Sequence, residues 1–193
     1  MSKPLPPSAT LAVDMIRTWA TANGLKVWEY PLDGSSAVLS ACGRYRYLLW
    51  RRAIGGLPFM SFGMLNPSTA DHSQDDPTIR RCLHWANRSG MAGPLVWNLF
   101  ALRATDPTIM KAHSDPVGPA GDSAIELALA LSGLTVAAWG AHGSHQARQS
   151  AVLKRCAVAE AQLHTLSLTK DGSPGHPLYL SGQLEPQPWS YNW

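Results

Sequence analysis

Polar side chains, glycine and proline follow or interrupt four short apolar segments of the chain, residues 57–65, 95–100, 134–139 and 163–168. Asn66 and Pro67 follow the first segment, and Asn98 lies within the second. Gly140 follows the third, and His176 comes after the fourth. A side-chain amide offers a donor and an acceptor side by side, so it can recognise the edge of a planar base. A histidine can donate to a developing oxyanion. These residues therefore predict a ligand site.

Further candidates surround these positions. Ser68 and Thr69 lie where a helix start could present free backbone amides to an anion. Phe100 and Tyr179 are aromatic side chains on which a base could stack. We assign catalytic roles to Asn66 and His176, and expect neither a cofactor nor a metal ion. The residues expected to bind a base or nucleotide are Pro67, Ser68, Thr69, Asn98, Phe100, Arg103, Gly140, His142 and Tyr179.

Structural roles compete with several of these assignments. Asn-Pro pairs often begin turns, so Asn66 can be explained without chemistry. Phe100 lies in an apolar segment, where aromatic side chains usually pack in a core. The acidic run Asp71, Asp75 and Asp76, with His72, could bind a metal ion in a hydrolase, but it fits helix capping better.

The four apolar segments alternate with three helical patterns. One begins at Asp76-Pro77 and ends at Ser89-Gly90, the second spans 121–131, and the third spans about 144–160. Strands that alternate with helices form parallel sheets covered on both faces. We therefore predict an α/β fold of three layers with a central, mainly parallel, four-stranded sheet. Ligands of such sheets bind beyond the carboxyl ends of the strands.

The N-terminal part has a different pattern. Ser8 can cap a helix in which Leu11, Met15, Ile16 and Trp19 recur at helical spacing before Asn23-Gly24. Residues 37–40 and 45–50 then predict a β-hairpin, with Gly43 in its turn. We expect a helical extension over residues 1–36 and a single α/β domain over residues 37–193.

The charged residues indicate what kind of ligand the protein could bind. The 193 residues carry 16 Lys and Arg against 13 Asp and Glu, a formal net charge of +3. Arginine is concentrated between residues 44 and 103, and this pattern suits the recognition of phosphate or carboxylate groups. The eight arginines there are Arg44, Arg46, Arg51, Arg52, Arg80, Arg81, Arg88 and Arg103.

Cysteine usage and hydropathy predict a cytoplasmic protein. Three cysteines without close spacing argue against a disulfide framework. Cys82 and Cys156 fall on apolar helical faces and are expected in the core. No apolar run approaches the roughly 20 residues that cross a bilayer, so we expect no membrane association.

Two resemblances add to this interpretation. Residues 45–51, 64–71, 76–81, 98–107, 138–140 and 175–179 resemble an uncharacterised bacterial and phage family, domain of unknown function 1643, over about residues 37–189. The order of strands and motifs is also similar to the uracil-DNA glycosylase superfamily. That similarity implies that Asn66 orients a water molecule, Asn98 reads the base, and His176 stabilises negative charge on its carbonyl oxygen.

This chain departs from the glycosylases in two places. An amide at position 66 cannot act as a general base. Leu178, Tyr179 and Leu180 stand where the glycosylases have serine-rich or basic residues that insert into duplex DNA. We therefore expect a protein that recognises a nucleobase in a nucleotide or single-stranded nucleic acid, and that hydrolyses the N-glycosidic bond of a modified base. The alternative is a non-catalytic module that binds a nucleotide, nucleic acid or partner protein.

Overall fold

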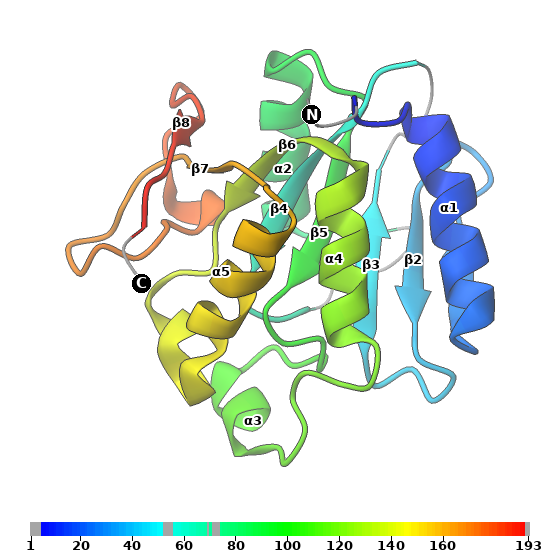
Figure 1. The fold of residues 1–193 in the computed structure, drawn as a ribbon, viewed down its shortest axis with the longest axis horizontal. Helices are drawn as coiled ribbons and strands as arrows, with labels where there is room; N and C mark the ends of the chain where they lie inside the picture. Colours follow the sequence, from blue (N-terminus) through cyan, green and yellow to red (C-terminus); the bar gives the residue numbers. More distant parts are fainter. Residues whose placement is uncertain (1–4, 52–55, 69, 71–73, 192–193) are drawn as a thin grey trace.

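One mixed sheet runs through the computed structural model, which describes residues 5–51, 56–68, 70 and 74–191 (Figure 1). Its eight described strands follow the order β1-β2-β3-β5-β4-β6-β7-β8. Their bounds are β1 (Lys26–Glu29), β2 (Ser36–Leu39), β3 (Arg46–Trp50), β4 (Phe59–Met64), β5 (Pro94–Asn98), β6 (Ser132–Ala137), β7 (Leu163–Thr165) and β8 (Gln187–Pro188).

The sheet is wider and less parallel than the sequence predicts. The four apolar segments form β4 to β7, which pair in parallel in the order β5-β4-β6-β7. The other four pairings, β1–β2, β2–β3, β3–β5 and β7–β8, are antiparallel. The prediction of a four-stranded, mainly parallel sheet was therefore wrong. The hairpin extends the sheet at β5, and a segment near the C-terminus extends it at β7.

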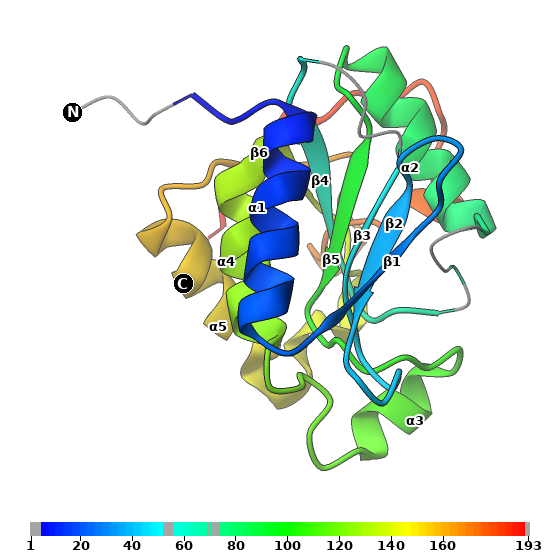
Figure 2. The same ribbon diagram turned by 90° about the vertical axis from the view of Figure 1, so that its right-hand side faces the viewer.

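Helices cover both faces of this sheet, as expected for an α/β fold (Figure 2). Helix α2 (Pro77–Arg88) covers one face, and α1 (Ala9–Ala22), α4 (Gly121–Leu131) and α5 (Arg148–Val158) cover the other. Alternate side chains of β5 divide between the two cores. Trp97 packs in the core of α1, α4 and α5, whereas Val96 packs in the core of α2.

Local signals fix the ends of two predicted helices. The Asp76 side chain accepts a hydrogen bond from the Ile79 backbone nitrogen at 2.8 Å, and α2 ends before Ser89, as predicted. Helix α4 also has its predicted bounds. Helix α5 begins later than predicted, because Gln146 and Ala147 have positive φ angles, which separate α5 from the short helix η1 (Ala141–Ala147). Two further short helices, α3 (Pro107–Ala112) and η2 (Pro177–Tyr179), were not predicted.

The N-terminal helix shares a core with the rest of the fold. Its fully buried residues include Ala9, Ala12 and Ile16, in the cluster that holds α4. The apolar stripe expected from the sequence was partly wrong, since Leu11 and Met15 are 54% and 43% exposed. Small alanine side chains allow α1 to approach its neighbours closely. The boundary at residue 36 stays a prediction, but the helix before it is part of the core.

The predicted hairpin is confirmed. Strands β2 and β3 pair antiparallel, with Val38 opposite Leu48. Gly43 in the connecting turn has a φ of 72°, a conformation that glycine adopts without strain.

All three cysteines are free thiols. Cys82 and Cys156 are buried in the core as predicted, and burial raises the pKa of both, to about 12 for Cys156. Over the described residues, no helix has both the length and the apolar character that a membrane span requires.

Candidate functional site

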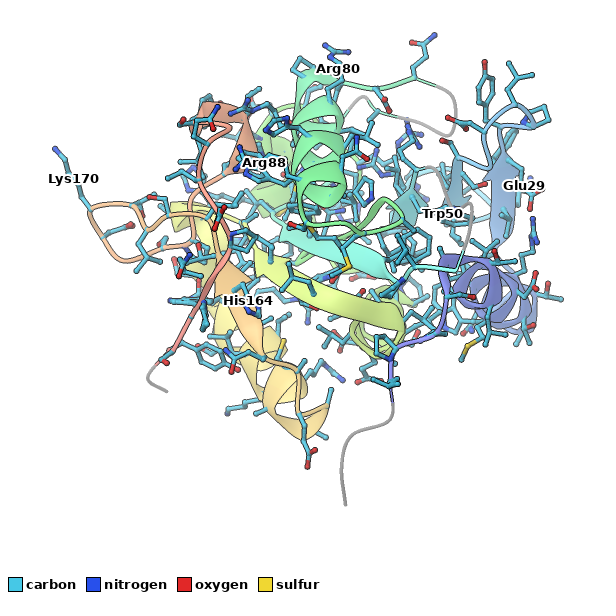
Figure 3. All side chains as sticks on the ribbon, turned by 90° about the horizontal axis from the view of Figure 1, so that it is seen from above. Glu29, Trp50, Arg80, Arg88, His164 and Lys170 are labelled. Carbon is cyan, nitrogen blue, oxygen red and sulfur yellow. The ribbon has the colours of Figure 1, made fainter. Side chains whose placement is uncertain are left out.

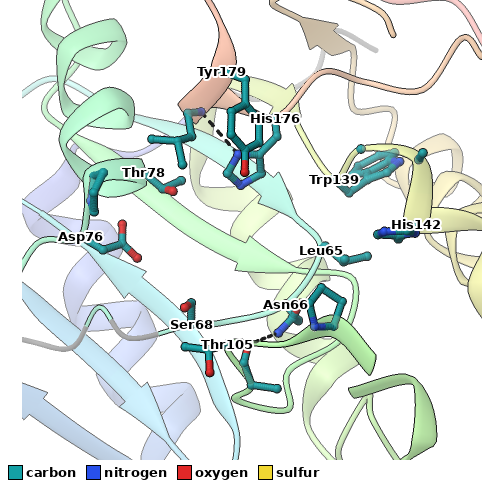
Figure 4. A pocket seen from close by; sticks show the side chains of 16 residues that line it. Leu65, Asn66, Ser68, Asp76, Thr78, Thr105, Trp139, His142, His176 and Tyr179 are labelled. Carbon is teal, nitrogen blue, oxygen red and sulfur yellow. Dashed lines mark hydrogen bonds between the residues drawn. The ribbon is translucent and has the colours of Figure 1, made fainter. Parts of the chain in front are cut away.

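A cleft of about 570 Å³ opens beyond the carboxyl ends of β4 and β6 (Figure 4). The segment after β4, the start of α2, the turn after β6 and the helix η2 all contribute to its walls. Carboxyl ends of parallel strands are where α/β sheets bind ligands. Six of the residues expected at a site line this one cleft: Asn66, Ser68, Gly140, His142, His176 and Tyr179.

Asn66 is held in one orientation by two backbone carbonyls. Its Nδ2 donates to the Ala104 oxygen at 2.7 Å and to the Pro67 oxygen at 3.2 Å. The Ala104 nitrogen in turn donates to the Pro67 oxygen at 2.9 Å, which ties the two loops together. Because carbonyl oxygens only accept hydrogen bonds, the donating amide nitrogen faces them rather than the amide oxygen. Asn66 therefore offers its Oδ1 as an acceptor in a wall of the cleft.

His176 complements this acceptor with a donor. Its Nδ1 accepts a long hydrogen bond of 3.4 Å from the Leu178 nitrogen at the start of η2. Burial lowers the pKa of His176, and the nearby Asp76 charge opposes this effect only in part. The ring is therefore neutral at neutral pH. With Nδ1 as the acceptor, the proton is on Nε2, and His176 can donate from that atom.

The Tyr179 ring lies beside His176, with the ring centroids 5.6 Å apart and the planes tilted by 46°. Tyr179 is 81% exposed, so this large aromatic surface is accessible at the mouth of the cleft. The aromatic ring, the imidazole and the amide lie around one opening in Figure 4. This arrangement suits a flat polar ligand.

Asp76 is the lining residue whose importance the sequence did not reveal. It caps α2, as expected, but its carboxylate also projects into the cleft on the side of Thr78 (Figure 4). Helix starts that follow a strand in α/β sheets point toward the ligand edge. That rule applied to Asp76-Pro77 would have placed the carboxylate at the site.

Gly140 shapes the opposite wall. Its φ of 69° and ψ of −170° fall in a region that only glycine adopts readily. Its nitrogen donates to the Pro174 oxygen at 2.8 Å, which fastens the turn after β6 to the segment that carries His176. On the same side, His142 Nδ1 accepts a hydrogen bond from Lys111 Nζ at 3.1 Å. A lysine ammonium group therefore lies behind this side of the cleft, next to the lining residue His142.

The remaining predicted residues lie elsewhere. Asn98 is only 5% exposed, and the described lining of the cleft does not include it. Phe100 is fully buried in the core, and Pro67 is buried as well and is not among the described lining residues of the cleft. Arg103 lines a different hollow. Thr69 lies outside the described residues.

Four of the seven arginines of the basic stretch that the structure describes hold loops in place, and Arg52 lies outside the described residues. Arg46 donates to a backbone carbonyl of the segment before α2, and Arg51 pairs with Asp75 at 2.6 Å. Arg81 and Arg88 donate to carbonyls of residues 180–182, and Arg88 projects from α2 toward that segment in Figure 3. The basic stretch is therefore largely structural, although Arg44, Arg80 and Arg103 are exposed.

The acidic run considered as a metal site is only partly described. Asp71 and His72 lie outside the described residues, Asp75 pairs with Arg51, and Asp76 caps α2. In the ranges that the structure does describe, no group of three or more histidine, cysteine or acidic residues could hold a metal ion.

Comparison with known proteins gives one family. Residues 46–178 match the model of a protein family of unknown function, DUF1643. No curated protein and no solved structure is significantly similar to the chain. The match spans more than half of the 193 residues, so the chain belongs to this family.

Proposed function

We propose that this member of the DUF1643 family binds a nucleobase in the cleft between Asn66 and His176. The observation that carries the proposal is the pairing of an oriented acceptor, Asn66 Oδ1, with an oriented donor, His176 Nε2, in one cleft. A ring with a carbonyl and an adjacent N–H group can bind to both. The exposed Tyr179 ring adds a stacking surface, on which any of the bases can stack because every base has a π-face.

We further propose that the fold is related to the uracil-DNA glycosylase superfamily. The order of elements supports this relation. Asn66-Pro67 follows β4, Asn98 ends β5, Gly140 follows β6, and His176-Pro177 comes after β7. These four strands are adjacent and parallel in the sheet. Asn66, Gly140 and His176 share the cleft, whereas the base-reading role of Asn98 stays a prediction.

Hydrolysis of an N-glycosidic bond is the second part of the proposal, and Asp76 favours it. An amide at position 66 cannot take a proton from water, but the Asp76 carboxylate can. In the step we propose, the water oxygen bonds to C1′ of the sugar while the C1′–N bond breaks. The bonding electrons pass to the base, whose oxygen His176 Nε2–H stabilises, and Asp76 accepts the proton from the water.

Ligand binding is tested by thermal unfolding with a panel of nucleosides and nucleoside 5′-monophosphates. A ligand at about 100 times its Kd should stabilise the protein by about 2.7 kcal/mol. We expect this stabilisation to be lost in Asn66→Ala and His176→Ala but kept in Asn87→Ala, which removes an exposed amide from α2. Stabilisation that survives in both cleft variants would refute the proposed site.

Catalysis is tested separately, by release of free base from single-stranded oligonucleotides that contain uracil or hypoxanthine. Asp76→Asn is the informative variant, because asparagine caps a helix about as well as aspartate but is not a base. Binding without base release by the wild-type protein would favour the non-catalytic module. Base release that persists in Asp76→Asn would exclude Asp76 as the general base.

A further inference from the structure

A second hollow, of about 380 Å³, lies near the cleft at the same end of the sheet. It is formed by the start of β1 and the turn between β2 and β3, and this turn lies at the same end of the molecule as α3 (Figures 1 and 2). The residues of its lining that matter here are Lys26, Trp28, Ser40, Cys42, Gly43 and Arg103. None of them belongs to the site described above.

The hollow is positively charged. Lys26 and Arg103 line it, and none of the described lining residues carries a carboxylate. Within the described ranges, neither Lys26 nor Arg103 forms an ion pair. Arg103 Nη1 donates to the Gly43 oxygen at 3.3 Å, which holds its guanidinium over the turn. Two cations without a counterion in a concave surface favour an anionic ligand.

The Cys42 thiol lies in the same hollow, beside Ser40. Its Sγ lies 3.3 Å from Ser40 Oγ, and that hydrogen bond, followed by the contacts with Arg44, lowers the pKa of Cys42 to about 7. A lowered thiol pKa means that the negatively charged form is favoured. Ser40, which lines the hollow, and the neighbouring Arg44 therefore favour negative charge on the Cys42 side chain.

An aromatic side chain accompanies these charges. Trp28 lies on the edge strand β1 and is 48% exposed, although tryptophan is usually well buried. Single-stranded nucleic acids bind where a cationic groove follows the phosphates and aromatic side chains stack on the bases. The hollow combines both features, because Trp28 offers an aromatic ring for stacking and Lys26 and Arg103 offer positive charge for phosphates.

The chain connects this hollow to the cleft. Arg103 lines the hollow, and the next two residues, Ala104 and Thr105, line the cleft. Successive Cα atoms are 3.8 Å apart, so those of residues 103 and 105 are separated by at most about 7.6 Å. The Ala104 oxygen is also the group that orients Asn66. One short segment thus forms a wall of both cavities.

We propose that the cleft and the hollow form one path for a single-stranded nucleic acid. One base occupies the cleft, the neighbouring nucleotide stacks on Trp28, and the intervening phosphates contact Lys26 and Arg103. The inference rests on the proposed function for the identity of the ligand. It also selects a strand over a free nucleotide as the substrate class.

The experiment measures fluorescence anisotropy of a labelled, mixed-sequence, single-stranded DNA of 12 nucleotides. We expect Trp28→Ala to weaken binding about five-fold or more, and Trp28→Tyr, which keeps a stacking ring, to restore it. Lys26→Ala with Arg103→Ala should make the slope of log affinity against log salt shallower by about 1.4, that is, about 0.7 for each lost phosphate contact. Lys154→Ala with Lys170→Ala removes the same charge elsewhere and should leave that slope unchanged.

The outcomes separate this inference from the proposed function. Equal binding of the strand by wild type, Trp28→Ala and the Lys26/Arg103 double variant would refute the second subsite, as would a strand that binds no more tightly than a nucleoside 5′-monophosphate. If nucleotide binding still depends on Asn66 and His176, the proposed function survives that result. If binding of the single-stranded DNA depends on Trp28 but not on Asn66 or His176, the second subsite is supported and the proposed function of the cleft is refuted.

Discussion

Asn66→Asp changes one atom and reverses the hydrogen-bonding character of the side chain in the cleft wall. In the wild-type protein, Nδ2 donates to the carbonyl oxygens of Ala104 and Pro67 at 2.7 and 3.2 Å. An aspartate at this position presents an oxygen to those two oxygens. Two hydrogen bonds are lost and like partial charges face each other, so the structure explains why an amide stands here.

Each lost hydrogen bond is worth about 1 kcal/mol, and repulsion between the new carboxylate and the two carbonyl oxygens adds to the cost, so we expect the free energy of unfolding to fall by about 2–3 kcal/mol at pH 7. The same energy must appear as a raised pKa of the new carboxyl, by about 2 units at about 1.4 kcal/mol for each unit. The folded protein then binds this proton more tightly than the unfolded chain. The stability of Asn66→Asp relative to wild type is therefore greatest below about pH 4, and this relative stability is lost as pH rises toward about 6.

The assay is urea unfolding followed by tryptophan fluorescence, for wild type and variant at each pH. The difference between the two proteins cancels the titration of groups that they share. Gln187→Glu, an exposed amide-to-carboxyl change in β8, serves as the control and should show little difference at either pH. A variant as stable as wild type at pH 7, or a deficit that stays constant with pH, would refute the reasoning about Asn66.

Three further predictions concern other cleft residues. Asp76→Ala should lower the free energy of unfolding by about 1 kcal/mol and Asp76→Asn by much less, because only alanine removes the cap of α2. Equal losses of stability in the two variants, measured by thermal unfolding, would contradict this prediction. The pKa of His176 is lowered in the folded protein, so the unfolded chain takes up this proton first as pH falls below about 6.5. Wild type should therefore lose free energy of unfolding between pH 7.5 and 5.5, and His176→Gln should lose less of it, as urea unfolding at the two pH values would show. Gly140→Ala should cost about 1–3 kcal/mol through backbone strain alone, since a Cβ there meets no atom within 4 Å; an unchanged unfolding midpoint would exclude that strain.

The elements that the sequence predicts well have signals within a few residues. Asp76-Pro77 and Ser89-Gly90 delimit α2, and Gly43 marks the hairpin turn, because caps and turns depend on local chemistry. The edges of the sheet depend on distant partners instead. Strand β8 is Gln187–Pro188, two exposed residues without any apolar alternation, and only its pairing with β7 makes it a strand.

The candidate site divides in the same way. Asn66 and His176 follow strands that lie close together in the parallel part of the sheet, so the rule of carboxyl ends predicts that they meet. Asn98 is still within β5, in register with Met64, and it is buried instead of lying beyond the end of the strand. The role of Arg81 was beyond sequence reasoning, since it binds a carbonyl 99 residues away.

The central claim is that one flat heterocycle binds to Asn66 and His176 together. Its most direct test is a crystal structure with the nucleoside 5′-monophosphate that raises the unfolding temperature most. We predict a base in the cleft, with Asn66 Oδ1 and His176 Nε2 each about 2.7–3.2 Å from its polar atoms. A nucleotide bound elsewhere on the protein, or one in the cleft whose base contacts neither atom, would contradict the claim.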